Sequence, residues 1–237
     1  GRAHARPFSL RVPPDDLGQC ALPLPKRSYG FDPIFKIQGP QDMSVSDTPH
    51  KISRYPVPDV MDLPEDLREM ILGVQEKAGF IPNVFLALAH RPDELRAFVA
   101  YHDALMEKDS GLTKAEREMI VVATSARNEC QYCVVAHGAI LRIRAKNPLI
   151  ADQIAANYRK ADITPRQRAM LDFAMKVSQD AGAVEDADLV ALTAHDFNDE
   201  DIWDIAAIAA FFALSNRMAN FTAMRPNDEF YSLGRGM

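Results

Sequence analysis

The fold is decided by one stretch of the chain, residues 113–137, which reads TKAEREMIVVATSARNECQYCVVAH. Thr113 and the glutamate three residues after it form a capping box, so we expect a helix to begin there and to run to about Arg127. Residues 128–129 interrupt this helix, and a second helix is expected to begin at or near Cys130. The stretch therefore predicts two consecutive helices, with a Cys-x-x-Cys pair at the start of the second.

The chain from about Asp62 onward has the same helical pattern. Apolar residues recur every three or four positions, and no run of β-branched and aromatic residues alternates with period two. Further helices are expected from Asp62 to Gly79, from Pro82 to Ala89, from Pro92 to about Lys108, from Thr164 to about Gly182 and from Asn198 onward. The sequence therefore predicts an all-α fold, a multi-helix bundle.

An internal similarity suggests a degenerate repeat of the helix pair. The segment that begins near Phe197 resembles the one that begins at Leu112, and the alignment places Ser215 opposite Cys130. The second copy would then be a structural helix pair without chemistry. Chance similarity between two alanine-rich amphipathic segments explains the resemblance equally well.

The first 42 residues differ from the rest of the chain. They are rich in proline, sustain no helical period and contain Cys20, and Met43 opens a stretch that looks like a natural beginning. We therefore expect residues 1–42 to be an extension outside the core fold, and residues 43–237 to form a single domain. A transit peptide is an alternative for the extension, although its acidic residues count against it.

Composition excludes several classes of function. The chain has 237 residues, of which 47% are apolar and 25% charged, and a formal net charge of -6. This charge makes a broad nucleic-acid or anionic-membrane surface unlikely, and the longest apolar run, Ile205 to Leu214, is too short to cross a bilayer. Three cysteines are too few for a disulfide framework. We expect a cytoplasmic protein that binds neither nucleic acid nor membrane.

The pair of cysteines and two neighbouring residues can carry redox chemistry. A cysteine at a helix start meets the positive end of the helix dipole, which lowers its pKa and favours Cys130 as the reactive thiolate. His137 is four residues after Cys133, so the two share a helix face, and this favours Cys133 instead. Glu118, within an apolar stretch, could orient the imidazole or accept its proton. These arguments do not decide which of the two cysteines attacks.

Each of these residues also has an ordinary structural explanation. The cysteines could be a chance pair in the core, His137 a hydrogen-bonded packing residue, and Glu118 a residue on a solvated helix face. Two cysteines, a histidine and a carboxylate could also ligate zinc. Structural zinc sites, however, usually draw two ligand pairs from separate loops, whereas Cys130, Cys133 and His137 lie on one continuous helix. We expect no metal and no cofactor.

The pattern Glu-x11-Cys-x2-Cys-x3-His, formed by Glu118, Cys130, Cys133 and His137, resembles a known family. It is similar to the alkylhydroperoxidase D-like (AhpD-like) branch of the carboxymuconolactone decarboxylase superfamily. The segment Gly79–Phe85 also resembles that superfamily, and residues 216–220 (Asn-Arg-Met-Ala-Asn) are similar to its peroxidase-related subgroup. The resemblance covers roughly residues 55–226.

This resemblance implies an all-α fold, with the site buried at a subunit interface in dimers, trimers or hexamers. It further implies reduction of a hydroperoxide substrate without metal or haem. In that scheme Cys133 is the peroxidatic thiolate, His137 takes its proton, Glu118 is a relay and Cys130 resolves the sulfenic acid as a disulfide. A dithiol reductant, either a lipoyl protein or a thioredoxin-like protein, would then reduce the disulfide. One departure is Tyr132, where the best-known relatives have histidine before the second cysteine.

Two other functions compete with the thiol peroxidase. One is a lactone-processing enzyme related to carboxymuconolactone decarboxylase, whose chemistry does not need two thiols. The other is a non-enzymatic redox sensor or oligomeric scaffold that uses the same disulfide as a switch. A homo-oligomer is also expected, because small residues on a late helix permit close packing against a helix of another subunit. The same residues could instead pack within the chain's own core. They are Ala206, Ala207, Ala209, Ala210 and Ala213, with Phe211, Phe212 and Phe221 nearby.

Overall fold

The computed structural model describes residues 51–236, and these residues form helices and turns with no strand. The all-α prediction is confirmed. The helices are α1 (Glu65–Ala78), α2 (Asn83–Leu88), α3 (Pro92–Met106), α4 (Lys114–Arg127), α5 (Gln131–Ala145), α6 (Ile150–Asn157), α7 (Pro165–Asp180), α8 (Asp186–Thr193), α9 (Asp199–Thr222) and α10 (Glu229–Ser232). The expected extension, residues 1–42, lies outside the described residues, so the division of the chain stays a prediction.

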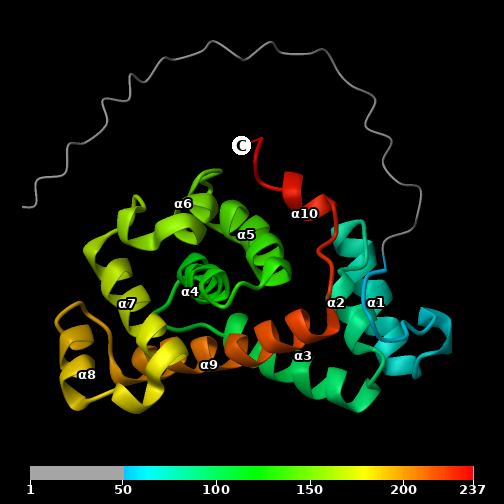
Figure 1. The fold of residues 1–237 in the computed structure, drawn as a ribbon, viewed down its shortest axis with the longest axis horizontal. Coiled ribbons are helices and arrows are strands. Elements are labelled where there is room, and N and C mark those ends of the chain that lie inside the picture. Colours follow the sequence, from blue (N-terminus) through cyan, green and yellow to red (C-terminus); the bar gives the residue numbers. More distant parts are fainter. Residues whose placement is uncertain (1–50, 237) are drawn as a thin grey trace, which may run out of the picture. The chain divides into compact units, whose positions relative to one another are not determined.

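Helix α4 lies at the centre of the bundle (Figure 1). Every residue from Glu116 to Ser125 is buried, and α5, α6, α7 and α9 all pack against this helix. A helix enclosed on all sides must bury its charged residues as well, and these need partners. Arg117, which is 0% exposed, forms an ion pair with Asp204 of α9 at 3.1 Å and donates a hydrogen bond to the carbonyl of Leu105.

The capping residues mark the helix starts. The expected capping box is present at Thr113, whose side chain accepts from the backbone N–H of Glu116, and equivalent boxes begin α7 and α9. The expected start of the first helix at Asp62 is wrong by three residues. Asp62 ends a short 3-10 turn, and α1 begins only after Pro64, whose ring cannot continue the turn into the helix.

The segment expected to form a second helix pair is instead one continuous helix, α9. Between α4 and α5 the chain turns at Glu129, which has a positive φ of 54°. The corresponding positions in α9 are Ala213 and Leu214, both good helix formers, so nothing interrupts that helix. The resemblance between the two segments is therefore limited to their helix starts.

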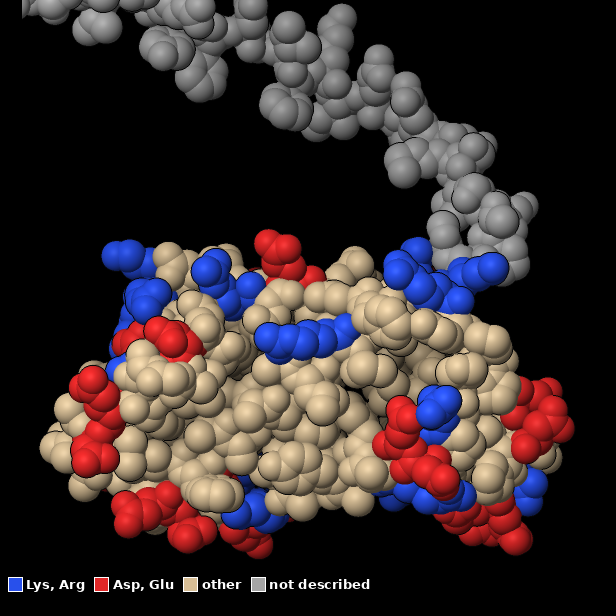
Figure 2. All heavy atoms as spheres, turned by 60° about the horizontal axis from the view of Figure 1, so that its bottom comes forward, with Lys and Arg blue, Asp and Glu red and all other residues tan. Residues whose placement is uncertain are grey.

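Helix α9 is the longest helix described, and it is rich in apolar residues. By length and composition alone it could cross a membrane, which the short run Ile205–Leu214 did not suggest. In the structure, 56% of its most apolar window is buried within the domain. The side of the domain on which α3 and α9 lie is largely uncharged in its middle, and most of its charged residues are at the edges (Figure 2).

The core consists of three clusters of buried residues. The largest surrounds α4, α7 and α9, and another joins α1 to α2 and α3. The remaining cluster holds Cys130 and Cys133 at the start of α5. The other members come from α5, α2, α9 and the C-terminal segment, and they are Tyr132, Ala136, Ala139, Ala87, Ala219, Met224 and Phe230. The Cys-x-x-Cys pair thus lies inside the domain, where four parts of the chain meet.

Candidate active site

The turn between α4 and α5 places the cysteines, and side chains of α9 hold this turn. The side chain of Asn128 donates a hydrogen bond to the side-chain oxygen of Asn216 at 2.9 Å. Asn216 in turn donates to the hydroxyl of Ser125 at 2.9 Å, and Asn220 donates to the backbone carbonyl of Asn128 at 3.2 Å. Two asparagines one helical turn apart on α9 therefore fix both the end of α4 and the turn that follows.

Cys130 is the N-cap of α5, the position that Ser, Thr, Asp or Asn usually occupies. Its sulfur accepts a hydrogen bond from the backbone N–H of Cys133 at 3.4 Å, as a capping oxygen would. The Cys133 sulfur lies 3.8 Å from the hydroxyl of Ser215 on α9. Both cysteines are free thiols, and they are 0% and 1% exposed. The pair is therefore reduced, buried and located at the positive end of a helix.

The two thiols differ in acidity. A hydrogen bond from the Cys133 thiol, supported by the Cys133 backbone N–H, lowers the pKa of Cys130 to about 7, although burial opposes this shift. The same hydrogen bond, together with burial, raises the pKa of the Cys133 thiol well above its ordinary value. A nearby His137 also favours the Cys130 thiolate. The lowered pKa of Cys130 agrees in direction with the helix-dipole argument.

His137 and Glu118 form a hydrogen-bonded pair. The His137 Nδ1 atom lies 2.8 Å from Glu118 Oε2, and the other carboxylate oxygen lies 4.0 Å from Nε of Arg144. The Phe212 ring packs nearly perpendicular to the imidazole, with the ring centroids 4.8 Å apart. Among the hydrogen bonds of residues 51–236, the imidazole is joined to this carboxylate and to neither sulfur, although it lies on the same helix as Cys133.

Tyr132, between the cysteines, has a structural contact. Its hydroxyl accepts a hydrogen bond from the backbone N–H of Val84 at 3.1 Å, which joins α5 to the start of α2. Burial raises the pKa of the phenol far above its ordinary value, so the side chain stays neutral. Tyr132 therefore ties two helices together, and it does not supply a proton-transfer group of the kind that a histidine would.

The four residues expected at the site are thus close together in α4 and α5, but the residues that support them come from elsewhere. Ser215 contacts the Cys133 sulfur, and Asn216 and Asn220 hold the turn. Residues 216–220 stood out in the sequence only through their resemblance to the peroxidase-related subgroup. No group of three or more His, Cys, Asp or Glu residues within the described part of the chain is arranged to hold a metal ion.

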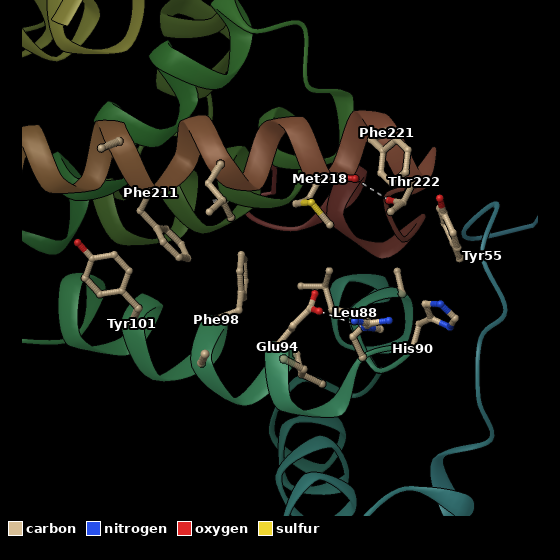
Figure 3. A pocket seen from close by; sticks show the side chains of 16 residues that line it. Tyr55, Leu88, His90, Glu94, Phe98, Tyr101, Phe211, Met218, Phe221 and Thr222 are labelled. Carbon is tan, nitrogen blue, oxygen red and sulfur yellow. Dashed lines mark hydrogen bonds and ion pairs between the residues drawn. The ribbon is translucent and has the colours of Figure 1, made fainter.

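An apolar groove of about 700 Å³ lies between α3 and α9 (Figure 3). Phe98 and Tyr101 of α3 line one wall, while Phe211 and Met218 of α9 line the other. Neither cysteine lines this groove, but Ala87 belongs both to its wall and to the cluster that holds the cysteines. The groove wall and the cluster that holds the cysteines therefore meet at Ala87.

Comparison with known proteins gives the family. Residues 92–156 match the model of the carboxymuconolactone decarboxylase family. The chain is 71% identical to a solved structure from Ralstonia eutropha JMP134, described as an alkylhydroperoxidase AhpD core and an uncharacterized peroxidase-related protein, with a TM-score of 0.78. The match covers 79% of this chain and 98% of that one.

A peroxidase-related protein from Silicibacter sp. TM1040 is 42% identical, with a TM-score of 0.75, and the match covers 80% of this chain and all of that one. The debrominase Bmp8 has the same fold at 17% identity, with a TM-score of 0.63 and coverage of 78% and 96%. No curated protein sequence is significantly similar to the chain. The high identity and nearly full coverage of the first two structures show that this chain belongs to the AhpD-like, peroxidase-related branch of the carboxymuconolactone decarboxylase superfamily.

Proposed function

We propose that this protein is a thiol-dependent hydroperoxide reductase that uses Cys130 and Cys133 as its redox pair. The observation that carries the proposal is the pair itself: two free thiols at a helix start, of which one lowers the pKa of the other to about 7. A thiolate is the reactive form of cysteine, and a second thiol three residues away on a helix start can resolve its oxidised form. The family assignment supports the same chemistry.

The reaction begins at the Cys130 thiolate. It attacks one oxygen of the hydroperoxide and the O–O bond breaks. The alkoxide leaves as an alcohol after it takes, through His137, the proton that the Cys130 thiol gave up when it became a thiolate. Cys130 is then a sulfenic acid, which the Cys133 sulfur attacks to form a disulfide with release of water. Two thiols and one hydroperoxide thus give one disulfide, one alcohol and one water. This order reverses the roles that the family resemblance implied, because the lowered pKa belongs to Cys130.

In this scheme Glu118 positions the imidazole of His137. The 2.8 Å hydrogen bond to its carboxylate fixes the orientation of the ring. The disulfide returns to two thiols through a dithiol reductant, for which a lipoyl protein and a thioredoxin-like protein are the two candidates. A reducing compartment such as the cytoplasm suits a centre that must be reduced after each turnover.

The test is a thiol titration with an organic hydroperoxide, in a Cys20→Ser background so that the pair alone is counted. We expect two thiols to be lost per chain and one intramolecular disulfide to form, with turnover when dihydrolipoamide or reduced thioredoxin is added. His137→Gln should slow peroxide consumption by about 10²-fold or more. Cys20→Ser alone should match the unaltered chain.

The outcomes separate the competing functions. If Cys130→Ser and Cys133→Ser both consume peroxide as fast as the Cys20→Ser chain, the pair is not the redox centre and the proposal fails. Disulfide formation without turnover on either donor would instead favour the redox sensor. If neither thiol is consumed, the chemistry of the site does not involve peroxide, and a lactone-processing enzyme becomes the better hypothesis.

A further inference from the structure

Neither cysteine is accessible to a second thiol in the conformation described above. Cys130 and Cys133 are 0% and 1% exposed, so their sulfurs have almost no contact with solvent. Thiol–disulfide exchange, however, requires an attacking thiolate to reach a disulfide sulfur directly. A part of the protein that covers the pair must therefore move before a dithiol can reduce it.

The α10 segment, residues 228–236, is a weakly held part of this cover. It packs on α5, the helix at whose start the cysteines lie (Figure 1). Of its residues only Phe230 is buried, and that side chain belongs to the cluster that holds the cysteines. Its outer contact, the ion pair between Arg235 and Asp152, is exposed to solvent and contributes little to stability. Because segments with so few buried contacts open locally at a low cost in free energy, the α10 segment can move while the bundle stays folded.

A buried arginine holds the α10 segment closed. Arg142 of α5 is 3% exposed, and its guanidinium donates hydrogen bonds to the carbonyls of Phe230 and Leu233, both at 2.9 Å. Among the hydrogen bonds of residues 51–236, the partners of Arg142 are these two carbonyls and no carboxylate. Burying a cation against neutral oxygens alone is unfavourable, and burial lowers the pKa of this group. When the segment lifts, water reaches the guanidinium, so opening recovers part of the free energy that the broken contacts cost.

The redox state of the cysteine pair can reach this segment through Gln131. Gln131 lies between the two cysteines, and its side-chain amide donates a hydrogen bond to the hydroxyl of Tyr231 at 3.2 Å. In the reduced protein, the Cys130 sulfur caps α5 by accepting from the backbone N–H of Cys133. A disulfide places the two sulfurs about 2 Å apart, so the first turn of the helix must shift when it forms. Gln131 is the first residue of α5, and this shift therefore weakens its contact with Tyr231.

We propose that the α10 segment is a redox-dependent gate: it is closed over the reduced pair, and formation of the disulfide opens it to a dithiol reductant. The gate rests on the function proposed above, because only an oxidised pair needs reduction. In the open state, one thiolate of the dithiol attacks a sulfur of the Cys130–Cys133 disulfide, the S–S bond breaks, and a mixed disulfide forms. The second thiolate of the dithiol then attacks the dithiol's sulfur in the mixed disulfide and releases the second cysteine. The dithiol is oxidised to a disulfide, and its two protons end on Cys130 and Cys133.

Amide hydrogen exchange measures the opening of the segment directly. All chains carry Cys20→Ser, and diamide, a general thiol oxidant, forms the disulfide, so the result does not depend on turnover of a peroxide. The loss of one hydrogen bond should make residues 228–236 exchange about three- to tenfold faster in the disulfide form than in the reduced form. Exchange in α4, at the centre of the bundle, should be the same in both forms. Equal exchange of residues 228–236 in the two forms, or a pair that diamide does not oxidise, would overturn the gate.

Two variants test the contacts that hold the gate. Tyr231→Phe removes the hydroxyl that Gln131 contacts, so the reduced form should exchange as fast as the disulfide form. Tyr101→Phe, which alters an exposed tyrosine of α3, is the matched control and should keep the difference between the forms. Arg142→Met removes both hydrogen bonds to the segment, and dihydrolipoamide should reduce its disulfide faster by the same factor as residues 228–236 exchange faster. Arg166→Met should change neither rate, since Arg166 also donates to a backbone carbonyl but lies in the first turn of α7.

The results distinguish failure of the gate from failure of the redox function. If Arg142→Met speeds exchange of the segment but not reduction of the disulfide, the reductant uses another route and the gate is refuted. A difference between the two forms that survives Tyr231→Phe would refute the coupling through Gln131, and this test decides if circular dichroism shows that Arg142→Met does not fold. If the gate fails while hydroperoxide still consumes both thiols, the proposed function stands without it. If the segment responds to diamide while hydroperoxide consumes no thiol, the gate stands and the pair serves another oxidant.

Discussion

Replacing Cys133 by alanine tests the most specific electrostatic feature of the site. The Cys133 thiol is the main cause of the low pKa of Cys130, so its removal should return that pKa toward the ordinary value. An ordinary thiol is only about 3% thiolate at pH 7, and the lowered pKa of Cys130 gives it a larger thiolate fraction at that pH. The variant should therefore lose most of its thiolate at neutral pH.

The size of this shift follows from the strength of one hydrogen bond. A hydrogen bond to a charged group contributes about 1.5 to 3 kcal/mol, and one pKa unit corresponds to about 1.4 kcal/mol. Losing the thiol donor should therefore raise the titration midpoint of Cys130 by about one to two pH units. Because the backbone N–H of residue 133 still donates to the sulfur, the lower end of this range is expected.

The titration of Cys130 is measured by the ultraviolet absorbance of the thiolate, because this signal does not require a reagent to reach a buried sulfur. All chains carry Cys20→Ser, and absorbance is followed as pH rises. Cys133→Ser is the matched control because its hydroxyl can still donate a hydrogen bond to Cys130, so its midpoint should rise less than that of Cys133→Ala. If Cys130→Ala leaves a thiol that titrates near pH 7, then Cys133 is the acidic residue and the assignment is wrong.

Three further predictions concern stability, each measured by urea unfolding. Asp204→Ala leaves the fully buried Arg117 without its carboxylate and should cost about 3 to 5 kcal/mol. Tyr132→Phe leaves the backbone N–H of Val84 without its partner and should cost about 1 to 3 kcal/mol. Asn216→Ala removes the hydrogen bonds to Ser125 at the end of α4 and to Asn128 in the turn that follows. It should lower the free energy of unfolding by about 1 to 3 kcal/mol and also slow peroxide consumption.

Each of these predictions has an outcome that contradicts it. Asp152→Ala breaks an exposed ion pair with Arg235 and should cost less than about 1 kcal/mol, so an equal loss in Asp204→Ala would mean that burial of the Arg117 pair is unimportant. A Tyr132→Phe chain as stable as the unaltered one would show that the Val84 contact is dispensable. If Asn216→Ala lost stability but kept full activity, the turn would not depend on that side chain for its catalytic geometry.

Local sequence signals predicted much of the fold. The capping boxes at Thr113 and Thr164 and the left-handed Gly79 are short-range features, decided within three or four residues, so the sequence alone located those helix ends. Helix α6 begins at Ile150, its N-cap Leu149 makes no side-chain capping bond, and no capping signal in the sequence marks this start. The sequence comparison did not predict that α9 is continuous. The start of α9 resembles the start of α4, but this similarity carries no information about whether the helix is interrupted further along.

The site was predictable only in part. Glu118 and His137 were expected to lie close together, and their hydrogen bond confirms this proximity, while their catalytic roles stay predictions. The roles of the two cysteines could not be ordered from spacing, because their pKa values depend on which thiol donates to the other. Ser215 could not have been found at all, since its contact with Cys133 joins residues 82 positions apart.

The position of α9 limits how far this site can be transplanted. The family match ends at residue 156 and contains all four residues of the Glu-x11-Cys-x2-Cys-x3-His pattern. The asparagines that hold the cysteine turn lie some sixty residues beyond that limit, at 216 and 220. The family motif is thus not a self-sufficient module. Grafting it onto another helical scaffold would transfer the reactive groups without the asparagine hydrogen bonds that position the cysteines.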